Sequence, residues 1–298
     1  MKSDAKPPSE RTLDGDIPEL REYLRPGATV LDVGCGKGTI TLDVAAAIKP
    51  GKVIGLDPDE QQVDVVRNWL AQQPAVDNVS FQMGDSHALD FSDGTFDLVY
   101  SHTVIHFFLD PVDTLKEQAR VTKPGGWVVV SGVREWAYSV RNPPCPNWDR
   151  YMEARELHSE AWLKDFRSSG LRPADYIRQK MANSLTHMDY MDFHGGKKCA
   201  GWLVDAGLKD LKIGIKAERV RYHGAPDMEP GTIWDLLPVD APETPLEREL
   251  VVTARTMIAN GLLDASTLER AKDEIRVWYG NPRALFFNIL VFAAGRKA

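Results

Sequence analysis

The 298-residue chain has little of several features that mark particular protein classes. Its three cysteines, Cys35, Cys145 and Cys199, are too widely spaced for a disulfide framework or a CxxC zinc site. No apolar run approaches the roughly 18 residues that span a bilayer, and the polar start MKSDAKPPSE lacks the apolar stretch of a secretory signal. No His/Asp/Glu cluster has metal-ligand spacing either. The sequence therefore predicts a cytoplasmic protein with no membrane span and no metal.

Positive charge is also scarce, with 36 Lys and Arg against 43 Asp and Glu and a formal net charge of −7. This balance argues against a protein whose affinity comes from neutralising a phosphate backbone, so we expect no nucleic-acid partner. The content of 43% hydrophobic and 27% charged residues is ordinary for a globular protein. At about 150 residues per domain, the length suggests one large domain or two modest ones.

The first 133 residues alternate between strand-like and helix-like patterns. Short β-branched runs are expected to form strands at 29–33, 52–56, 79–83, 96–100 and 127–133, and helical spacing occurs at 17–24, 39–48, 59–73 and 111–121. Pro124-Gly125-Gly126 is expected to be a turn into the last of these strands. This alternation is typical of βαβ units on a parallel sheet, which binds ligands at the carboxyl ends of its strands.

The first strand ends in Asp32-Val33-Gly34-Cys35-Gly36-Lys37-Gly38, a glycine-rich loop that opens a helix. Its GxGxG spacing differs from the GxGxxG of dinucleotide sites. A carboxylate such as Asp32 would repel a pyrophosphate, but it suits a ligand with an ammonium and a sulfonium. The alternative interpretation is a plain tight turn between strand and helix.

Two further aspartates follow the next two strands. Asp57 lies 23 residues after Gly34, where an acidic side chain takes ribose hydroxyls, although Asp57-Pro58-Asp59-Glu60 also fits a helix cap. Asp85, in Gly84-Asp85-Ser86, can accept from the amino group of a base or can serve a turn. Three carboxylates at one edge of one sheet make a shared ligand more plausible than three coincidences.

With these motifs, the sequence resembles the class I S-adenosylmethionine-dependent methyltransferases, in the branch that contains the ubiquinone/menaquinone-biosynthesis C-methyltransferases. The resemblance covers about residues 20–133 and rests on VLDVGCGKGTITLDVA, GKVIGLDPDEQQVD, VSFQMGDSHALDFSDGTFDLVYSHTVIHF and EQARVTKPGGWVVVSG. It implies a Rossmann-like, doubly wound, seven-stranded and mostly parallel sheet with an antiparallel last strand. It also implies S-adenosylmethionine as cofactor and S-adenosylhomocysteine as product.

The resemblance further implies roles for individual residues. Asp32, Gly34 and Gly36 would line the methionine moiety, Asp57 would bind the ribose diol, and Asp85 would meet the adenine amino group. The neighbours Cys35, Pro58, Gly84 and Ser86 complete the predicted site, together with Ser101, which would approach the methionine by its backbone. Gln62 stands where relatives often have a methionine packed on adenine, and it is included in the predicted cofactor site. Arg120 matches an arginine that ties the family fold together outside the site.

Two histidines are candidates for a general base, because imidazole titrates near neutrality. His102 lies at the expected methyl-facing end of the fourth strand, and His106 lies four residues on. A base is needed only if the acceptor loses a proton as it attacks. The alternative is that either histidine simply packs or caps a helix.

The second half of the chain is expected to finish the sheet and to form a helical cap. Two insertions before and after the sixth strand, of about 60 and 50 residues, are too long for plain loops. Six of the eight Trp and six of the eight Tyr lie beyond residue 133, which suits a lid over an acceptor pocket or the lid's own core. The predicted parts are a flexible N-terminal arm (1–19), the cofactor-binding core (20–133), a cap insertion (134–195), a core helix and strand (196–221), a second cap insertion (222–280) and a final core strand (281–298).

The sequence thus predicts an enzyme that methylates a small, aromatic or apolar acceptor at oxygen, carbon or nitrogen, with a homodimer as a possible assembly. An alternative is a relative of the same fold that binds the cofactor but catalyses a cyclisation or decarboxylation. A nicotinamide dehydrogenase is disfavoured by GxGxG and Asp32. A non-catalytic regulatory partner is a further alternative, and it would bind the cofactor weakly or not at all.

Overall fold

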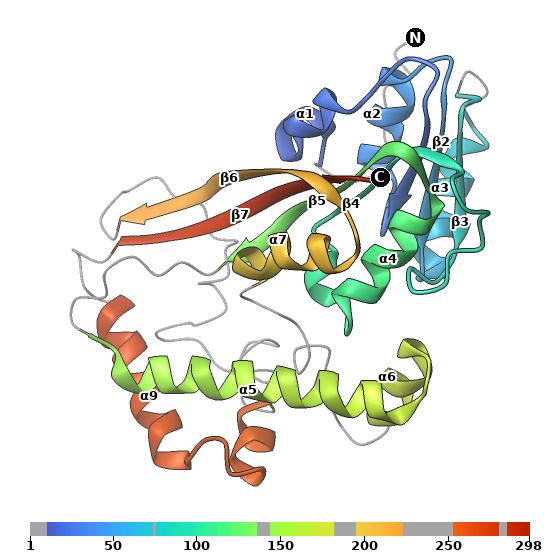
Figure 1. Ribbon diagram of the computed structural model, residues 1–298. Helices are drawn as coiled ribbons and strands as arrows, with labels where there is room; N and C mark the ends of the chain where they lie inside the picture. Colours follow the sequence, from blue (N-terminus) through green and yellow to red (C-terminus); the bar gives the residue numbers. More distant parts are fainter. Residues whose placement is uncertain (1–10, 74–75, 136–143, 182–194, 223–252, 280–284) are drawn as a thin grey trace. The chain divides into compact units, whose positions relative to one another are not determined.

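The computed structural model describes residues 11–73, 76–135, 144–181, 195–222, 253–279 and 285–298 (Figure 1). The chain divides into two compact units, which we describe separately. The sheet unit comprises the chain up to Glu135 together with residues 194–216 and 290–298, and the helical unit comprises residues 136–193 and 217–289. Among the described residues, no helix is long and apolar enough to cross a bilayer.

The sheet has seven strands in the order β3-β2-β1-β4-β5-β7-β6. The strands are β1 (Thr29–Val33), β2 (Lys52–Asp57), β3 (Val79–Met83), β4 (Phe96–His102), β5 (Thr122–Glu135), β6 (Lys209–Tyr222) and β7 (Leu285–Arg296). The five strands from β3 to β5 pair in parallel, and the last strand is antiparallel, which confirms the predicted Rossmann-like fold class. Because the strand order reverses between β1 and β4, the crevice at their carboxyl ends is the expected ligand position.

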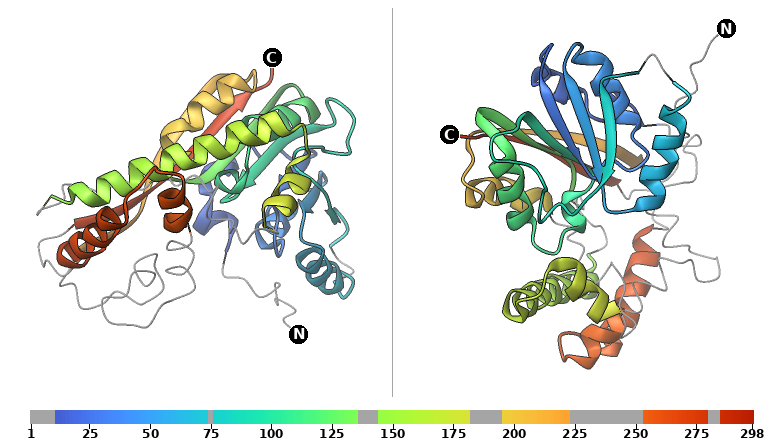
Figure 2. Two further views of the ribbon diagram at one scale, coloured as in Figure 1. Left: turned by 90° about the horizontal axis from the view of Figure 1, so that it is seen from below. Right: turned by 90° about the vertical axis from the view of Figure 1, so that its right-hand side faces the viewer.

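Both faces of this sheet are covered, as the alternation of side chains along β1 shows. Val30 packs with α2 (Thr39–Ala47) and α3 (Glu60–Leu70), whereas its neighbour Leu31 belongs to a second cluster that includes Val121 of α4 (Pro111–Val121). Figure 2 shows α2 and α4 on opposite sides of the strands. The helix α7 (Gly195–Asp205) ends before Gly207, whose φ of +83° is typical of a glycine that follows a helix.

The segment before the sheet differs from the flexible arm that the sequence predicts for residues 1–19. A short helix α1 (Leu13–Asp16) and a 3₁₀ helix η1 (Pro18–Glu22) replace the helix expected at 17–24. Leu13 and Ile17 are fully buried in the core beside α2, so this segment is folded onto the sheet unit from Thr12 onward. The prediction missed this because only two apolar side chains, separated by polar ones, anchor the segment.

The expected turn at Pro124-Gly125-Gly126 lies instead within β5, so that prediction was wrong. The pairing of β5 with β4 shifts register there, from Phe96–Thr122 to Leu98–Trp127, which accommodates the proline and glycines as an irregularity in the strand. Backbone hydrogen bonds from Gly125 N to Lys297 O and from Lys297 N to Gly126 O tie this irregular stretch to the end of the chain.

The helical unit contains α5 (Pro146–Ser169), α6 (Pro173–Met181), a helical stretch at 253–259 and α9 (Ala265–Tyr279). Its core includes Trp148, which stacks on Tyr151, and Met257. Glu274 of α9 accepts hydrogen bonds from the backbone N–H groups of Asn147 and Trp148 and thereby satisfies the first turn of α5. The aromatic residues described in this unit thus build its own core, and the predicted lid over the sheet stays a prediction.

Candidate functional site

The glycine-rich loop between β1 and α2 has the backbone conformation that only glycine adopts without strain. Gly34 has a φ of +80°, and a Cβ at this position would lie 2.6 Å from Cγ2 of Val104. Gly36 also has a positive φ, of +51°, but a Cβ there would meet nothing within 4 Å. The loop is therefore held tightly on one side and presents open backbone on the other, as a closely approaching ligand requires.

Asp32 lies at the end of β1 and is 97% buried, with a relative exposure of 3%. Its Oδ2 accepts hydrogen bonds from Thr41 Oγ1 at 2.6 Å and from Tyr100 Oη at 2.7 Å. Burial raises the pKa of this carboxyl to about 6 despite those two donors, which favour the ionised form. A cationic ligand group beside Asp32 would stabilise the carboxylate, so the site fits an ammonium.

Asp57, at the end of β2, joins the second strand to the glycine-rich loop. Its Oδ2 accepts a hydrogen bond from Gly36 N at 2.8 Å, and its Oδ1 accepts one from Asp59 N at 3.0 Å. The cap of α3 is Asp59, which accepts from the N–H groups of Gln61 and Gln62. The structure thus separates the two roles that the sequence left open: Asp59 caps the helix, and Asp57 lies at the loop.

Asp85 follows β3 and makes an Asx-type turn, because its Oδ1 accepts from His87 N at 2.9 Å and lies 3.2 Å from His87 Nδ1. The side chain of Asp85 is 39% exposed, whereas Ser86 is buried. Gly84 is required for packing, since a Cβ there would lie 2.5 Å from Cδ1 of Leu56. The turn function of Asp85 is therefore observed, and its contact with adenine stays a prediction.

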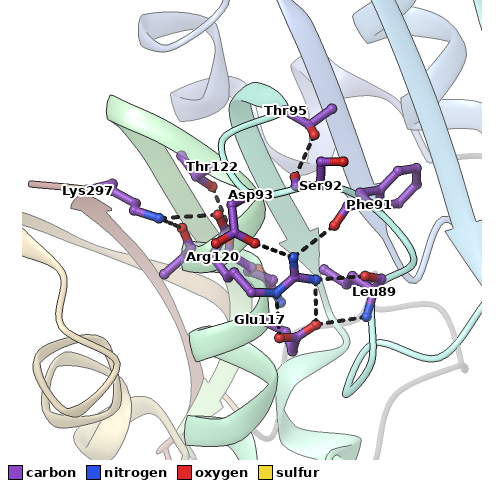
Figure 3. Close-up of polar contacts among 11 residues, drawn as sticks. Leu89, Phe91, Ser92, Asp93, Thr95, Glu117, Arg120, Thr122 and Lys297 are labelled. Carbon is purple, nitrogen blue, oxygen red and sulfur yellow. Dashed lines mark hydrogen bonds and ion pairs between the residues drawn. The ribbon is translucent and has the colours of Figure 1, made fainter.

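The loop that continues from Asp85 is fixed by Arg120 of α4 (Figure 3). The guanidinium donates to the carbonyl oxygens of Leu89 and Phe91 and pairs with Asp93 and Glu117, at distances between 2.7 and 2.9 Å. Glu117 in turn accepts from Leu89 N at 2.9 Å. Arg120 thus restrains the segment that carries Asp85 without itself lining the cavity described next.

A cavity of about 200 Å³ lies against the glycine-rich loop within the sheet unit. The residues that line it come from the N-terminal segment, β1, the loop, α2 and β4: Arg11, Asp32, Gly34, Cys35, Gly36, Lys37, Thr39, Ile40, Tyr100 and His102. Five of these lining residues were not predicted as site residues from the sequence: Arg11, Lys37, Thr39, Ile40 and Tyr100. Tyr100 lies opposite Asp32 in the pairing of β1 with β4. Its place beside Asp32 could be predicted only if the order of the strands in the sheet were known.

The two candidate bases lie in different surroundings. His102 lines the cavity, and its buried Nδ1 has no hydrogen-bond partner among the described residues. Burial lowers the pKa of His102 to about 4, with a further lowering by the nearby charge of Arg11. His106 is buried in the 3₁₀ helix η2 (Ile105–Phe107), with its ring 4.3 Å from that of Phe107, and is not among the residues lining the cavity. The structure therefore brings His102, and not His106, to the glycine-rich loop.

The remaining predicted residues surround this centre less closely. Ser101 is buried, and its Oγ has no hydrogen-bond partner among the described residues. Gln62 lies in the first turn of α3 and Pro58 is exposed before it. Burial raises the pKa of the Cys35 thiol far above its usual range, so Cys35 is not a nucleophile at neutral pH. No cluster of metal-ligating side chains occurs in the parts of the chain that the structure describes.

The strand order and its reversal between β1 and β4 define a Rossmann-like α/β domain with a cavity at its topological switch point, where such folds bind ligands. A family model described as a methyltransferase domain matches residues 24–169. These residues therefore carry a methyltransferase domain, and the predicted resemblance to the class I S-adenosylmethionine-dependent methyltransferases is confirmed.

Similar proteins are consistent with this assignment. The chain is 39% identical over 114 residues to an uncharacterized methyltransferase of Schizosaccharomyces pombe, covering 37% of this chain and 41% of that one. It is 32% identical over 163 residues to the demethylmenaquinone methyltransferase of Symbiobacterium thermophilum, covering 54% and 64%. The chain thus spans less than two thirds of either relative. A solved structure from Bacillus halodurans C-125, assigned to the methyltransferases, aligns with this chain with a TM-score of 0.52 and 16% identity. The alignment covers 95% of this chain and 98% of that one, and it shows that the two share a fold.

Proposed function

We propose that this protein transfers a methyl group from S-adenosylmethionine to a small, aromatic or apolar acceptor and releases S-adenosylhomocysteine. The observation that carries the proposal is Asp32, a buried carboxylate with a raised pKa that lines a cavity beside open glycine backbone. Asp57 at the next strand end and Asp85 after β3 supply acceptors for the remainder of a nucleoside. A ligand that combines an amino acid with a nucleoside fits this order of groups.

Asp57 retains the capacity to bind ribose despite its two backbone contacts. Each carboxylate oxygen has two acceptor positions, and each oxygen of Asp57 uses one of them for a backbone N–H. The second position on each oxygen is available in chemical terms for one hydroxyl of a ribose diol. The contact with Gly36 N also holds the carboxylate toward the glycine-rich loop, so the same side chain shapes the loop and binds the sugar.

The bound cofactor supplies an activated sulfonium methyl, and the protein's task is to orient it and the acceptor. His102 is the stronger candidate for a base, because it lines the cavity and its buried Nδ1 has no hydrogen-bond partner among the described residues. Its Nδ1 can accept a proton from an acceptor hydroxyl or carbon acid. His106 is retained as the weaker candidate, reachable only through a rearrangement of η2.

The acceptor class is inferred from the relative named as a demethylmenaquinone methyltransferase and from the aromatic content of the second half of the chain. We propose that the two cap insertions enclose the acceptor. A homodimer in the cytoplasm is part of the same proposal.

Two measurements on the purified full-length chain test the proposal. Calorimetry should show S-adenosylhomocysteine binding to the wild-type protein, and no binding would refute the cofactor assignment. Incubation of S-adenosylmethionine with a panel of phenols, quinols and aromatic amines, followed by mass spectrometry, should show an acceptor heavier by one CH₂ unit. A cofactor-dependent product of unchanged mass would instead support a cyclase, and loss of carbon dioxide would support a decarboxylase.

A further inference from the structure

Arg11 is the feature of the cavity that the proposed function does not use. It lies 21 residues before Asp32 in the chain, yet the two side chains line the same cavity of about 200 Å³. We propose that Arg11 binds the carboxylate at the amino-acid end of the cofactor and that Thr103 is the positioning residue that holds it there. The inference rests on the proposed function and assigns the recognition of one specific group within it.

The segment that carries Arg11 is anchored, so the guanidinium has a defined place. Leu13 and Ile17 are fully buried, and Leu13 N donates to Asp43 Oδ2 of α2 at 3.0 Å. Lys216 of β6 donates to the carbonyl oxygen of Gly15 at 3.2 Å. The short stretch from Arg11 to Ile17 therefore forms a strap across the sheet unit, and Arg11 is the residue of this strap that lines the cavity.

Thr103 fixes the direction of Arg11. Arg11 Nη1 donates to Thr103 Oγ1 at 2.6 Å, directly after the carboxyl end of β4. Thr103 has a φ of +56°, which is unusual for a β-branched residue, and its N–H donates to Ser131 O at 2.8 Å. Strained backbone of this kind persists where the surrounding structure enforces it, and it occurs often at ligand sites. Here it places the threonine hydroxyl where it holds the arginine.

The charges of the cavity match a free amino acid. Asp32 offers one buried carboxylate for an ammonium, while Arg11 offers a planar guanidinium that suits a carboxylate. The charge of Arg11 also lowers the pKa of His102, so the guanidinium acts on the part of the cavity that His102 lines. Lys37, on the exposed glycine-rich loop, is the competing cation in the lining, and the test below distinguishes it from Arg11.

The test compares ligands that differ only at the amino-acid end. Calorimetry would measure S-adenosylhomocysteine, its decarboxylated analogue and 5′-methylthioadenosine against wild type, Arg11→Met, Thr103→Val and Lys37→Met. Arg21→Met is the matched control, because Arg21 lies in the same segment, pairs with Asp14 and does not line the cavity. Arg11→Met should weaken S-adenosylhomocysteine about tenfold, the scale of one charge-assisted contact at a partly exposed site, and leave the decarboxylated analogue within twofold. Thr103→Val should show the same selectivity to a smaller degree.

Each other outcome has a definite meaning. Equal weakening of all three ligands by Arg11→Met would make Arg11 structural and overturn the inference, as would no effect. If Lys37→Met, and not Arg11→Met, selectively weakens the binding of S-adenosylhomocysteine, then Lys37 binds the carboxylate of the ligand and the inference is also overturned. If the wild-type protein binds none of the three ligands, the proposed function itself fails, so the two failures are distinguishable.

Discussion

The substitution Asp32→Asn should stabilise the ligand-free protein and at the same time abolish tight cofactor binding. Asparagine keeps an oxygen that can accept from Thr41 and Tyr100, but it removes the buried negative charge. The physical reason is that burial disfavours the ionised form of Asp32 and raises its pKa from 3.8 to about 6. The carboxylate is therefore retained at a cost in stability, for a cationic ligand.

The magnitude and its pH dependence follow from proton linkage. Between pH 4 and 6 the folded state binds more protons at Asp32 than the unfolded state, so the contribution of this group to stability is highest below pH 4 and is lost as the pH rises through 6. A pKa raised from 3.8 to about 6 corresponds to about 3 kcal/mol. Asp32→Asn should therefore gain up to about 3 kcal/mol over wild type at pH 7.5 and almost nothing at pH 4.

Urea unfolding of wild type and Asp32→Asn at several pH values between 4 and 7.5 measures this difference, and contributions from other titrating groups cancel between the two proteins. Calorimetry at pH 7.5 supplies the second half of the prediction: affinity for S-adenosylhomocysteine should fall about 10- to 100-fold, the scale of a lost charge-assisted contact. A variant that is less stable than wild type at pH 7.5 and binds the ligand unchanged would refute this reasoning.

Three further predictions concern the surroundings of the cavity. Asp57→Ala should weaken S-adenosylhomocysteine binding at least tenfold in calorimetry, because the variant loses two charge-assisted hydrogen-bond acceptors. The control Asp59→Ala removes the helix cap of α3, so it should lose about 1 kcal/mol of stability and keep its affinity within twofold. Arg120→Met should lower the free energy of unfolding of the sheet unit by about 2–4 kcal/mol, because five hydrogen bonds are lost and the charge of Glu117 is left unpaired by Arg120. A loss below about 1 kcal/mol would contradict the stabilising role of the Arg120 contacts drawn in Figure 3. Burial lowers the folded-state pKa of His102 from 6.5 to about 4, so its contribution to stability is present above pH 6.5 and is lost as the pH falls to 4. In urea unfolding, His102→Gln should therefore lose about 3 kcal/mol less stability than wild type over this pH range. An unchanged pH profile would mean that the imidazole of His102 is solvated.

The fold of the sheet unit followed from local patterns. The runs at 29–33 and 52–56 alternate with helical stretches and end at glycine or proline, and the observed β1 and β2 lie at those positions. Local patterns failed where long-range pairing decides the outcome. The strand β5 absorbs Pro124 and Gly125 as a register shift, because β4 and the end of the chain supply its partners.

The candidate site was predictable to the extent that strand ends are predictable. Asp32, Asp57 and Asp85 were found because each lies at or just after the end of a predicted strand. The choice between Asp57 and Asp59 as helix cap required atomic contacts, since both positions fit the capping pattern. Arg11 carries no signal of its own in the sequence, because its position at the cavity depends on how Leu13 and Ile17 anchor the strap in the core.

The most direct test of the account is a crystal structure of the full-length protein with S-adenosylhomocysteine. We predict density in the cavity beside the glycine-rich loop, with the ligand's ammonium at Asp32 and its ribose hydroxyls at Asp57. Density for the nucleoside at another surface, or a ribose turned away from Asp57 in a saturated crystal, would contradict the account.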